Sequence, residues 1–352
     1  MRRKRTELAN PLFGNTFHVT QRCTRQDALL HDSLRSRGKF QSRRAAILDR
    51  IRLLASAFAI DVLRFSIMSN HLHAILRNRP DIAQKLSDRE VVERWLRVCP
   101  GYCCALADYR NKPGDPVDEK EIQRILRDRN RVAELRLRLS SISYFMWALN
   151  NYTSKLFNLI DGKSGCFWQS RYKIKQLLDD LSLLVCGIYV DLNPIRAGAA
   201  KCPEESYYTS IFFNLQAAKL AAEISEVEMG NLPDAFFAPI TATSVDSERN
   251  TSKLPTRASD HGFAAMTQHE YFMLVDVVGR MLRKEKTGSI PAGFAPIFER
   301  LNLNWESLAE LVNSYEGLFK VFVGSRQSLE SRARELGGGK LRCPAEKSGH
   351  LP

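Results

Sequence analysis

The chain has 352 residues, of which 44% are hydrophobic and 26% are charged, and its formal net charge is +13. This composition is ordinary for a globular protein and argues against wholesale disorder, and the length predicts roughly two domains. The sequence lacks any run of about 18 apolar residues, and its basic N-terminus lacks the apolar stretch of a signal peptide. We therefore expect a cytoplasmic protein with no membrane partner. Eight scattered cysteines do not predict a disulfide scaffold.

The first elements in chain order are strands around one helix. Residues 16–22 alternate and carry β-branched and aromatic side chains, which predicts a strand. In residues 43–59 apolar side chains recur at helical spacing, which predicts an amphipathic helix. Residues 61–76 predict two strands that meet near Ser69-Asn70, because Asn tolerates the backbone angles of a tight turn.

The next stretch, residues 78–140, breaks this pattern with two proline-containing turns and a highly charged segment. We interpret it as an insertion with one solvated helix. Further elements follow it: a helix over 142–160 that ends at Gly162, a strand over 166–178, and a helix from Asp179 or Asp180 to about residue 193. The order of elements predicts an α+β fold with a ferredoxin-like antiparallel sheet and helices on one side.

The sequence changes in character after residue 202. Residues 1–200 carry a net charge of +15, whereas the remaining residues carry −2. We predict a domain over 1–202, a linker-like region over 203–262 and a helical C-terminal extension over 263–352, including the stretch SLAELVNSYEGLFKVFV. If the extension is a separate unit, a chain ending near residue 202 should retain some activity.

An excess of positive charge on one domain favours a polyanionic partner, nucleic acid above all, although a solubility role is the alternative. The basic residues of the first domain suit a phosphate backbone as a group, while each alone is more often a solvated charge; they are Arg22, Arg25, Arg43, Arg44, Arg64, Arg171, Lys173 and Lys175.

Two short segments carry candidate chemistry. His71 and His73 lie two residues apart on a predicted strand, so both face the same side and can chelate one divalent ion; paired surface or packed histidines are the more common alternative. Tyr189 and Asn193 lie four residues apart on a predicted helix and share a face, although a core tyrosine and a helix-ending asparagine are the default interpretations of the two residues taken alone.

Taken together, these segments resemble a known family. HLH in MSNHLHAIL matches the His-hydrophobic-His motif of HUH endonucleases, and its combination with WQSRYK and YVDLNPIRAG resembles the REP-associated tyrosine transposases. The opening FHVTQR also resembles the first strand of that family. The resemblance covers roughly residues 10–200, apart from the 78–140 insertion.

The resemblance implies a role for each matching residue. His71 and His73 would bind the metal, Asn193 would supply a third ligand through its amide oxygen, and Tyr189 would be the nucleophile. Trp168, Gln169 and Arg171 match the W-Q-x-R-[FY] segment, for which we expect packing together with substrate contact. With Arg22 and Lys173 they are the candidate DNA contacts. The implied activity is cleavage and rejoining of single-stranded DNA near hairpins through a 5′-phosphotyrosine. Two imidazoles and an amide oxygen suit Mg²⁺ or Mn²⁺. We therefore expect association with the nucleoid and allow for a homodimer.

Several alternatives stay open. A domesticated relative could bind DNA or RNA hairpins without cutting, and a metal-dependent hydrolase could use water in place of Tyr189. Cys99, Cys103 and Cys104 lack a second ligand pair for zinc, and the GGGK stretch at 337–340 lacks the strand and spacing of a phosphate-binding loop, so we expect no nucleotide cofactor. His18 is interpreted as a sheet residue rather than a ligand.

Overall fold

The computed structural model describes residues 9–24, 30, 42–99, 117–221, 232–241, 256–281, 312, 315 and 321–336. Its sheet contains β1 (Thr16–Arg22), β2 (Ile60–Ile67), β3 (His71–Asn78), β4 (Lys173–Leu177) and β5 (Phe322–Val323). The strands lie in the order β2-β3-β1-β4-β5. Neighbouring strands run antiparallel except β4 and β5, which run parallel.

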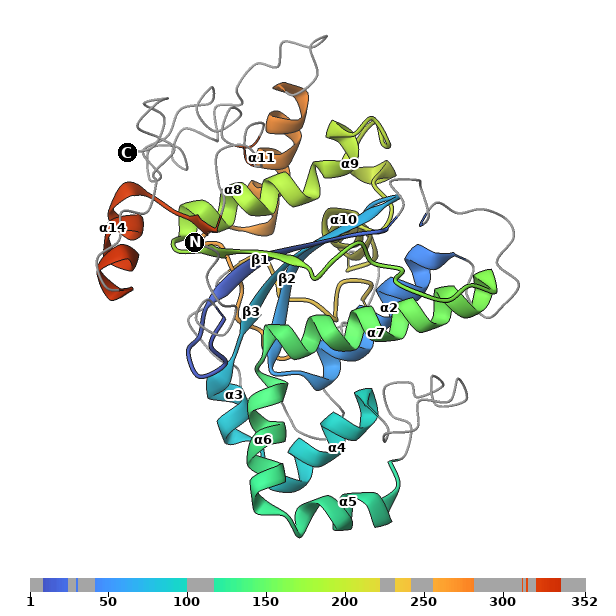
Figure 1. The fold of residues 1–352 in the computed structure, drawn as a ribbon. Helices are drawn as coiled ribbons and strands as arrows, with labels where there is room; N and C mark the ends of the chain where they lie inside the picture. Colours follow the sequence, from blue (N-terminus) through green and yellow to red (C-terminus); the bar gives the residue numbers. More distant parts are fainter. Residues whose placement is uncertain are drawn as a thin grey trace.

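Helices cover both faces of this sheet (Figure 1). On one face lie α2 (Arg43–Ala57) and α7 (Ile142–Asp161), and on the other lie α8 (Asp180–Asp191) and α11 (Gln268–Met281). The predicted mixed α+β class is confirmed, but the prediction of helices on one side is wrong. All eight residues of β2 are buried, so both faces of that strand are covered by other elements.

The alternation of side chains in β1 and β3 decides what each face carries. Phe17 and Val19 of β1 belong to the same apolar cluster as α2 and α7. His18 and Thr20 therefore face α8, because successive side chains of a strand point to opposite faces. In the β1–β3 register, Thr20 lies opposite His73. Both histidines of β3 thus share the α8 face with His18.

Most predicted elements of the first 200 residues are confirmed within a few residues. Gly162 ends α7 in the left-handed conformation, with a φ of 59°, which glycine adopts without a Cβ clash. The Asp179 side chain accepts a hydrogen bond from the Ser182 backbone and caps α8. That helix ends at Asp191. The short helix α9 (Asn193–Arg196) follows it and has Pro194 in its first turn. Strand β4 is shorter than the predicted 166–178.

The prediction for the 78–140 insertion is wrong. Its described residues form α3 (Pro80–Lys85), α4 (Asp88–Val98), α5 (Glu119–Leu126) and α6 (Arg129–Leu139). Apolar residues of α4 such as Val91, Val92 and Trp95 are buried in the same cluster as α2 and α7. The charged segment that we predicted as one solvated helix is interrupted because Asp128 caps a new helix. This region therefore adds a helical layer to the core.

The described part of residues 203–336 packs on the same sheet. After a 3₁₀ turn at Pro203–Glu205 come α10 (Ser210–Ala221), α11 and, beyond β5, α14 (Arg326–Glu335). Strand β5 lies at the end of the stretch predicted as a helix, where Phe322 and Val323 pair with β4. Val323 and α11 share one apolar cluster with α8. The predicted domain boundaries stay a prediction, and no helix within the described ranges is long and apolar enough to cross a membrane.

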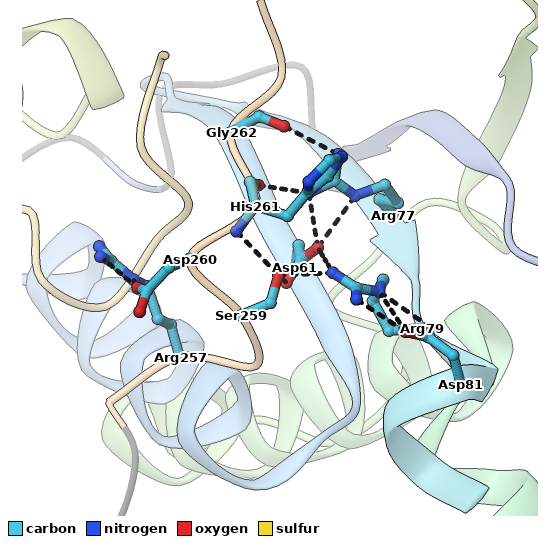
Figure 2. Close-up of polar contacts among 9 residues, drawn as sticks. All are labelled: Asp61, Arg77, Arg79, Asp81, Arg257, Ser259, Asp260, His261 and Gly262. Atoms are coloured by element: carbon cyan, nitrogen blue, oxygen red, sulfur yellow. Dashed lines mark hydrogen bonds and ion pairs between the residues drawn. The ribbon is translucent and has the colours of Figure 1, made fainter. Parts of the chain in front are cut away.

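A polar network ties part of the predicted linker to the sheet (Figure 2). Asp61 of β2, whose carboxylate is buried, pairs with Arg77 at 2.7 Å and with Arg79 at 3.5 Å. It also accepts a hydrogen bond of 2.7 Å from the Ser259 hydroxyl. Arg77 donates further to the backbone carbonyls of His261 and Gly262. Two arginines and a shared carboxylate thus hold the segment around 259–262 against β2 and β3.

Candidate functional site

A cavity of about 490 Å³ opens on the α8 face of the sheet, where β1, β3 and β4 meet α8 and α9. It brings together eight of the nine predicted site residues, which are His71, His73, Tyr189, Asn193, Arg22, Gln169, Arg171 and Lys173. These residues come from segments that lie far apart in the sequence. The cavity is therefore the candidate functional site.

The two histidines of β3 line the cavity side by side. Their ring centroids are 4.9 Å apart and their planes are nearly perpendicular, at 79°. His71 is half-buried, and its Nδ1 lies 2.6 Å from the side-chain oxygen of Asn70. Because an amide oxygen only accepts hydrogen bonds, this contact favours the proton on Nδ1 and the lone pair on Nε2. His71 is thereby set in the tautomer that can bind a metal through Nε2.

His73 is held from behind by two residues of β1. Its Nδ1 lies 2.9 Å from His18 Nε2 and 3.3 Å from the Thr20 hydroxyl. Its Nε2 lies on the other side of the ring, 3.5 Å from the Asn193 amide nitrogen. Hydrogen bonds to the remote nitrogen of an imidazole are the usual way in which a ligating histidine is oriented. The arrangement aims His73 Nε2 at Asn193 and the cavity.

Tyr189 and Asn193 reach the same space from the end of α8 and the start of α9. The Tyr189 ring lies 5.5 Å from the His73 ring, edge to face. It stacks on the ring of Tyr315 at 4.6 Å, and the Arg196 guanidinium lies 4.9 Å above it. Tyr189 is only 4% exposed, so it borders the cavity as part of the core packing. Tyr189 and Asn193, predicted to share a face of one helix, thus lie on two consecutive helices, and each contacts His73.

The donor chemistry of these residues fits a divalent metal ion. In the described part of the chain no three His, Cys, Asp or Glu side chains gather to form a metal site. A metal here would be held by His71, His73 and the Asn193 side chain. A flip of the Asn193 amide group would exchange its nitrogen for its oxygen at the position near His73 Nε2. This neutral N/O set leaves coordination positions for phosphate oxygens and suits Mg²⁺ or Mn²⁺.

Positive charge surrounds the cavity. Among the described residues that line it, five are cationic and none is an aspartate or glutamate; the cations are Arg22, Arg171, Lys173, Lys175 and Arg196. Concave surfaces lined by one sign of charge concentrate ligands of the opposite sign. The cavity is therefore suited to a phosphate-bearing polyanion.

Burial keeps two of the histidines neutral. It lowers the pKa of His18 to about 3, with Lys175 adding to the shift. The pKa of His73 also lies well below its usual range, because of burial first and then the neighbouring His18, His71, Lys175 and Arg22. A neutral imidazole is the form that ligates metal and accepts protons. Both rings therefore hold this form throughout the physiological pH range.

The metal-free protein is expected to lose stability on acidification. Between pH 6.5 and about 3 the unfolded chain protonates His18 and the folded chain does not, so the free energy of unfolding falls as pH falls through this window. At pH 5 the loss from His18 amounts to about 2 kcal/mol. Urea unfolding of wild type and His18→Gln at pH 7 and pH 5, with chelator present, measures it. Equal pH dependence in both proteins would contradict the burial argument.

The remaining basic residues and Trp168 lie elsewhere. Trp168 is 6% exposed and packs on the opposite face of the sheet, where its indole N–H donates to the Thr153 hydroxyl at 3.1 Å. The ring of Trp168 thus packs in the core outside the cavity, and its DNA contact stays a prediction. Arg43 pairs with Asp161, and Arg64 is fully buried. Arg44 lies over the ring of Tyr208. Arg25 lies outside the described residues.

Sequence reasoning did not assign several residues in or beside the site. His18, interpreted as a sheet residue only, also contacts His73, and Thr20 does the same. The alternation in FHVTQR could have placed His18 and Thr20 on the face of the sheet away from Phe17 and Val19. Arg196 follows Asn193 by three residues and could have been found from helical spacing. No signal in the sequence points to Tyr315, because it lies outside the segments that carry the motifs.

Comparisons with known proteins add little. No family model matches the chain, and no curated protein matches it in sequence. Among solved structures it is similar to a REP-associated tyrosine transposase bound to a REP hairpin, with 12% identity over 58% of this chain and 80% of that chain. The TM-score is 0.29. A similarity of this extent carries no argument about function.

Proposed function

We propose that this protein is a metal-dependent endonuclease of the HUH type that cleaves and rejoins single-stranded DNA near hairpins through a covalent 5′-phosphotyrosine. One observation carries the proposal. The side chains that the sequence motifs single out, His71, His73, Tyr189 and Asn193, line one cavity, although His73 and Asn193 lie 120 residues apart in the sequence. The cations of the same cavity provide the complementary surface for DNA.

The architecture supports the same proposal. Strands and helices follow one another as β1-α2-β2-β3-α7-β4, and the first four strands lie in the order β2-β3-β1-β4. Two βαβ-like halves of this kind make a ferredoxin-like sheet. We propose that this sheet is the HUH core, and that the helical insertion, α8, α11 and β5 are additions to it.

The residues of the site suggest how cleavage proceeds. Tyr189 Oη attacks the phosphorus, the new O–P bond forms as the P–O3′ bond breaks, and the departing 3′ oxygen takes up a proton to become a hydroxyl. The phenol proton passes to solvent, and the proton that the 3′ oxygen takes up comes from solvent, so the step conserves protons. The Arg196 guanidinium beside the Tyr189 ring stabilises the negative charge that develops on the phenol oxygen. Rejoining is the reverse attack by the 3′ hydroxyl.

His71, His73 and Asn193 would hold the metal. When bound, a divalent ion would polarise the scissile phosphate and orient it. The neutral state of His73 and the hydrogen bonds behind its ring keep its Nε2 lone pair directed at the cavity. Arg171, Lys173 and Lys175 would bind the flanking phosphates.

A denaturing gel tests the proposal. Purified protein is incubated with an end-labelled single-stranded oligonucleotide that carries a hairpin from DNA flanking the gene, with Mn²⁺ or with chelator. We expect a labelled protein–DNA adduct that survives denaturation and is absent with chelator. Cleavage without an adduct would identify a water-using hydrolase. Tight binding without cleavage across a panel of flanking hairpins would identify a non-catalytic hairpin-binding protein.

DNA binding is expected to depend steeply on salt. For single strands each neutralised phosphate contributes about −0.7 to the slope of log K against log salt concentration. Lys173→Gln should therefore flatten the slope by about 0.7, because Lys173 lines the cavity. Arg124→Gln removes the same charge from an exposed position on α5 that pairs with Glu121, and should leave the slope unchanged. Anisotropy titrations at several salt concentrations measure both; equal slopes for both variants would exclude the cavity as the phosphate-binding surface.

A further inference from the structure

The C-terminal part of the chain contributes one side chain to the back of the site. Tyr315 is fully buried, and its ring stacks on Tyr189 at an interplanar angle of 29°. Its hydroxyl oxygen lies 3.3 Å from His18 Nδ1, and the Lys175 ammonium lies 4.6 Å above its ring. Tyr315 thus contacts the candidate nucleophile directly and the candidate ligand His73 through His18.

These contacts form a row of hydrogen bonds from Tyr315 through His18 to His73. The row has two possible polarities, because each neutral imidazole carries one proton on one of its two nitrogens. If His18 is protonated on Nδ1, it donates to Tyr315 and its Nε2 accepts from His73 Nδ1. His73 Nε2 then keeps a lone pair. With the opposite polarity, His18 Nε2 donates to His73 and the proton of His73 moves to Nε2, the atom nearest Asn193.

We propose that Tyr315 is a positioning residue of the site: its hydroxyl accepts from His18 Nδ1, which sets the tautomers of His18 and His73, and its ring sets the orientation of Tyr189. The consequence for catalysis rests on the proposed function. The C-terminal segment is then part of the site, and a chain ending near residue 202 lacks a component of it.

The inference accounts for the burial of Tyr315. A phenol oxygen that is removed from water needs a hydrogen-bond partner, and His18 Nδ1 supplies one. Remote hydrogen bonds to a ligating imidazole typically change metal affinity by 10- to 100-fold when they are removed. The stack between Tyr315 and Tyr189 restricts the ring of the candidate nucleophile to one plane. Tyr315 therefore acts on Tyr189 directly and on the candidate metal ligand His73 through His18.

The test compares Tyr315→Phe with Tyr172→Phe. The first removes the hydroxyl and keeps the stack on Tyr189. The second removes a buried hydroxyl that bonds Ser143 and lies in the cluster on the opposite face of the sheet, so it controls for loss of stability. Long-range ¹H–¹⁵N spectra of metal-free protein with labelled histidines report which ring nitrogen is protonated, and Mn²⁺ titrations report metal affinity.

Wild type should show His18 and His73 protonated on Nδ1. Tyr315→Phe should shift His18 toward the Nε2 proton and weaken Mn²⁺ binding about tenfold, while Tyr172→Phe should change neither. A His18 proton on Nε2 in wild type, or unchanged tautomers and Mn²⁺ affinity in Tyr315→Phe, would overturn the inference. The spectra need no DNA, so a tautomer shift in a protein that cuts no DNA would refute the proposed function and leave the positioning role standing.

Discussion

Replacing Tyr189 by phenylalanine is expected to abolish the covalent adduct and to slow DNA cleavage by at least about 10³-fold, the scale on which loss of a nucleophile acts. Phenylalanine keeps the ring that stacks on Tyr315 and lies beside His73 and Arg196. Only the attacking oxygen is lost. The gel assay with a hairpin-bearing oligonucleotide measures the loss, and the matched binding titration should show DNA affinity within about twofold of wild type.

The result separates three mechanisms. Loss of both adduct and cleavage with intact DNA binding supports attack by Tyr189. Persistent cleavage without an adduct points to water as the nucleophile. An adduct that persists in the variant would mean that another side chain attacks, and peptide mapping of the labelled species would identify it.

Replacing Arg64 by leucine is expected to lower the free energy of unfolding by about 3–5 kcal/mol, because it leaves a buried carboxylate without its cation. Arg64 is fully buried on β2, with its guanidinium near the ring of Phe263, and its Nε lies 3.5 Å from Asp191 at the end of α8. Asp191 also accepts hydrogen bonds from the Ser210 hydroxyl at 2.6 Å and the Tyr271 hydroxyl at 2.8 Å. This cluster joins α8, α10 and α11 to the sheet.

The loss should depend on pH in a defined direction. Burial raises the pKa of Asp191, and Arg64 opposes that shift. Without Arg64 the pKa rises further, so the ionised carboxylate destabilises the fold above that pKa and the penalty shrinks as pH falls and Asp191 takes up a proton. Urea unfolding should show a smaller difference between variant and wild type at pH 5 than at pH 7. Adding Asp191→Asn should recover part of the loss, whereas a double variant no more stable than Arg64→Leu would contradict the explanation.

Local patterns predicted the parts of the site that lie close together in the sequence. Alternation placed His71 and His73 on one face of a strand, and i,i+4 spacing placed Tyr189 near Asn193, although the helix ends between them at Asp191. Strand register could not be predicted in the same way, since it depends on pairing between segments 50 or more residues apart. The contact of His18 with His73 follows from that register, so only the structure reveals it.

The fold was predictable where apolar periodicity matched one face of one element. Residues 16–22 and 43–59 matched β1 and α2 closely for this reason. The insertion was misinterpreted because its charged residues mask the buried side of α4, where Val91, Val92 and Trp95 pack into the core. Strand β5 was missed because two residues carry no periodicity, and their conformation is set by pairing with β4.

The contact between His18 and Tyr315 joins residues 297 positions apart. This spacing determines how late during synthesis the contact can form. Ribosomes extend a chain at about 5–20 residues per second, and domains fold as they emerge. Tyr315 follows Tyr189 by 126 residues, so the nascent chain carries Tyr189 for roughly 6–25 s before Tyr315 has been made. A ribosome-bound fragment that holds His71, His73, Tyr189 and Asn193 therefore still lacks Tyr315, and under the proposed function its site would be incomplete until that residue is added.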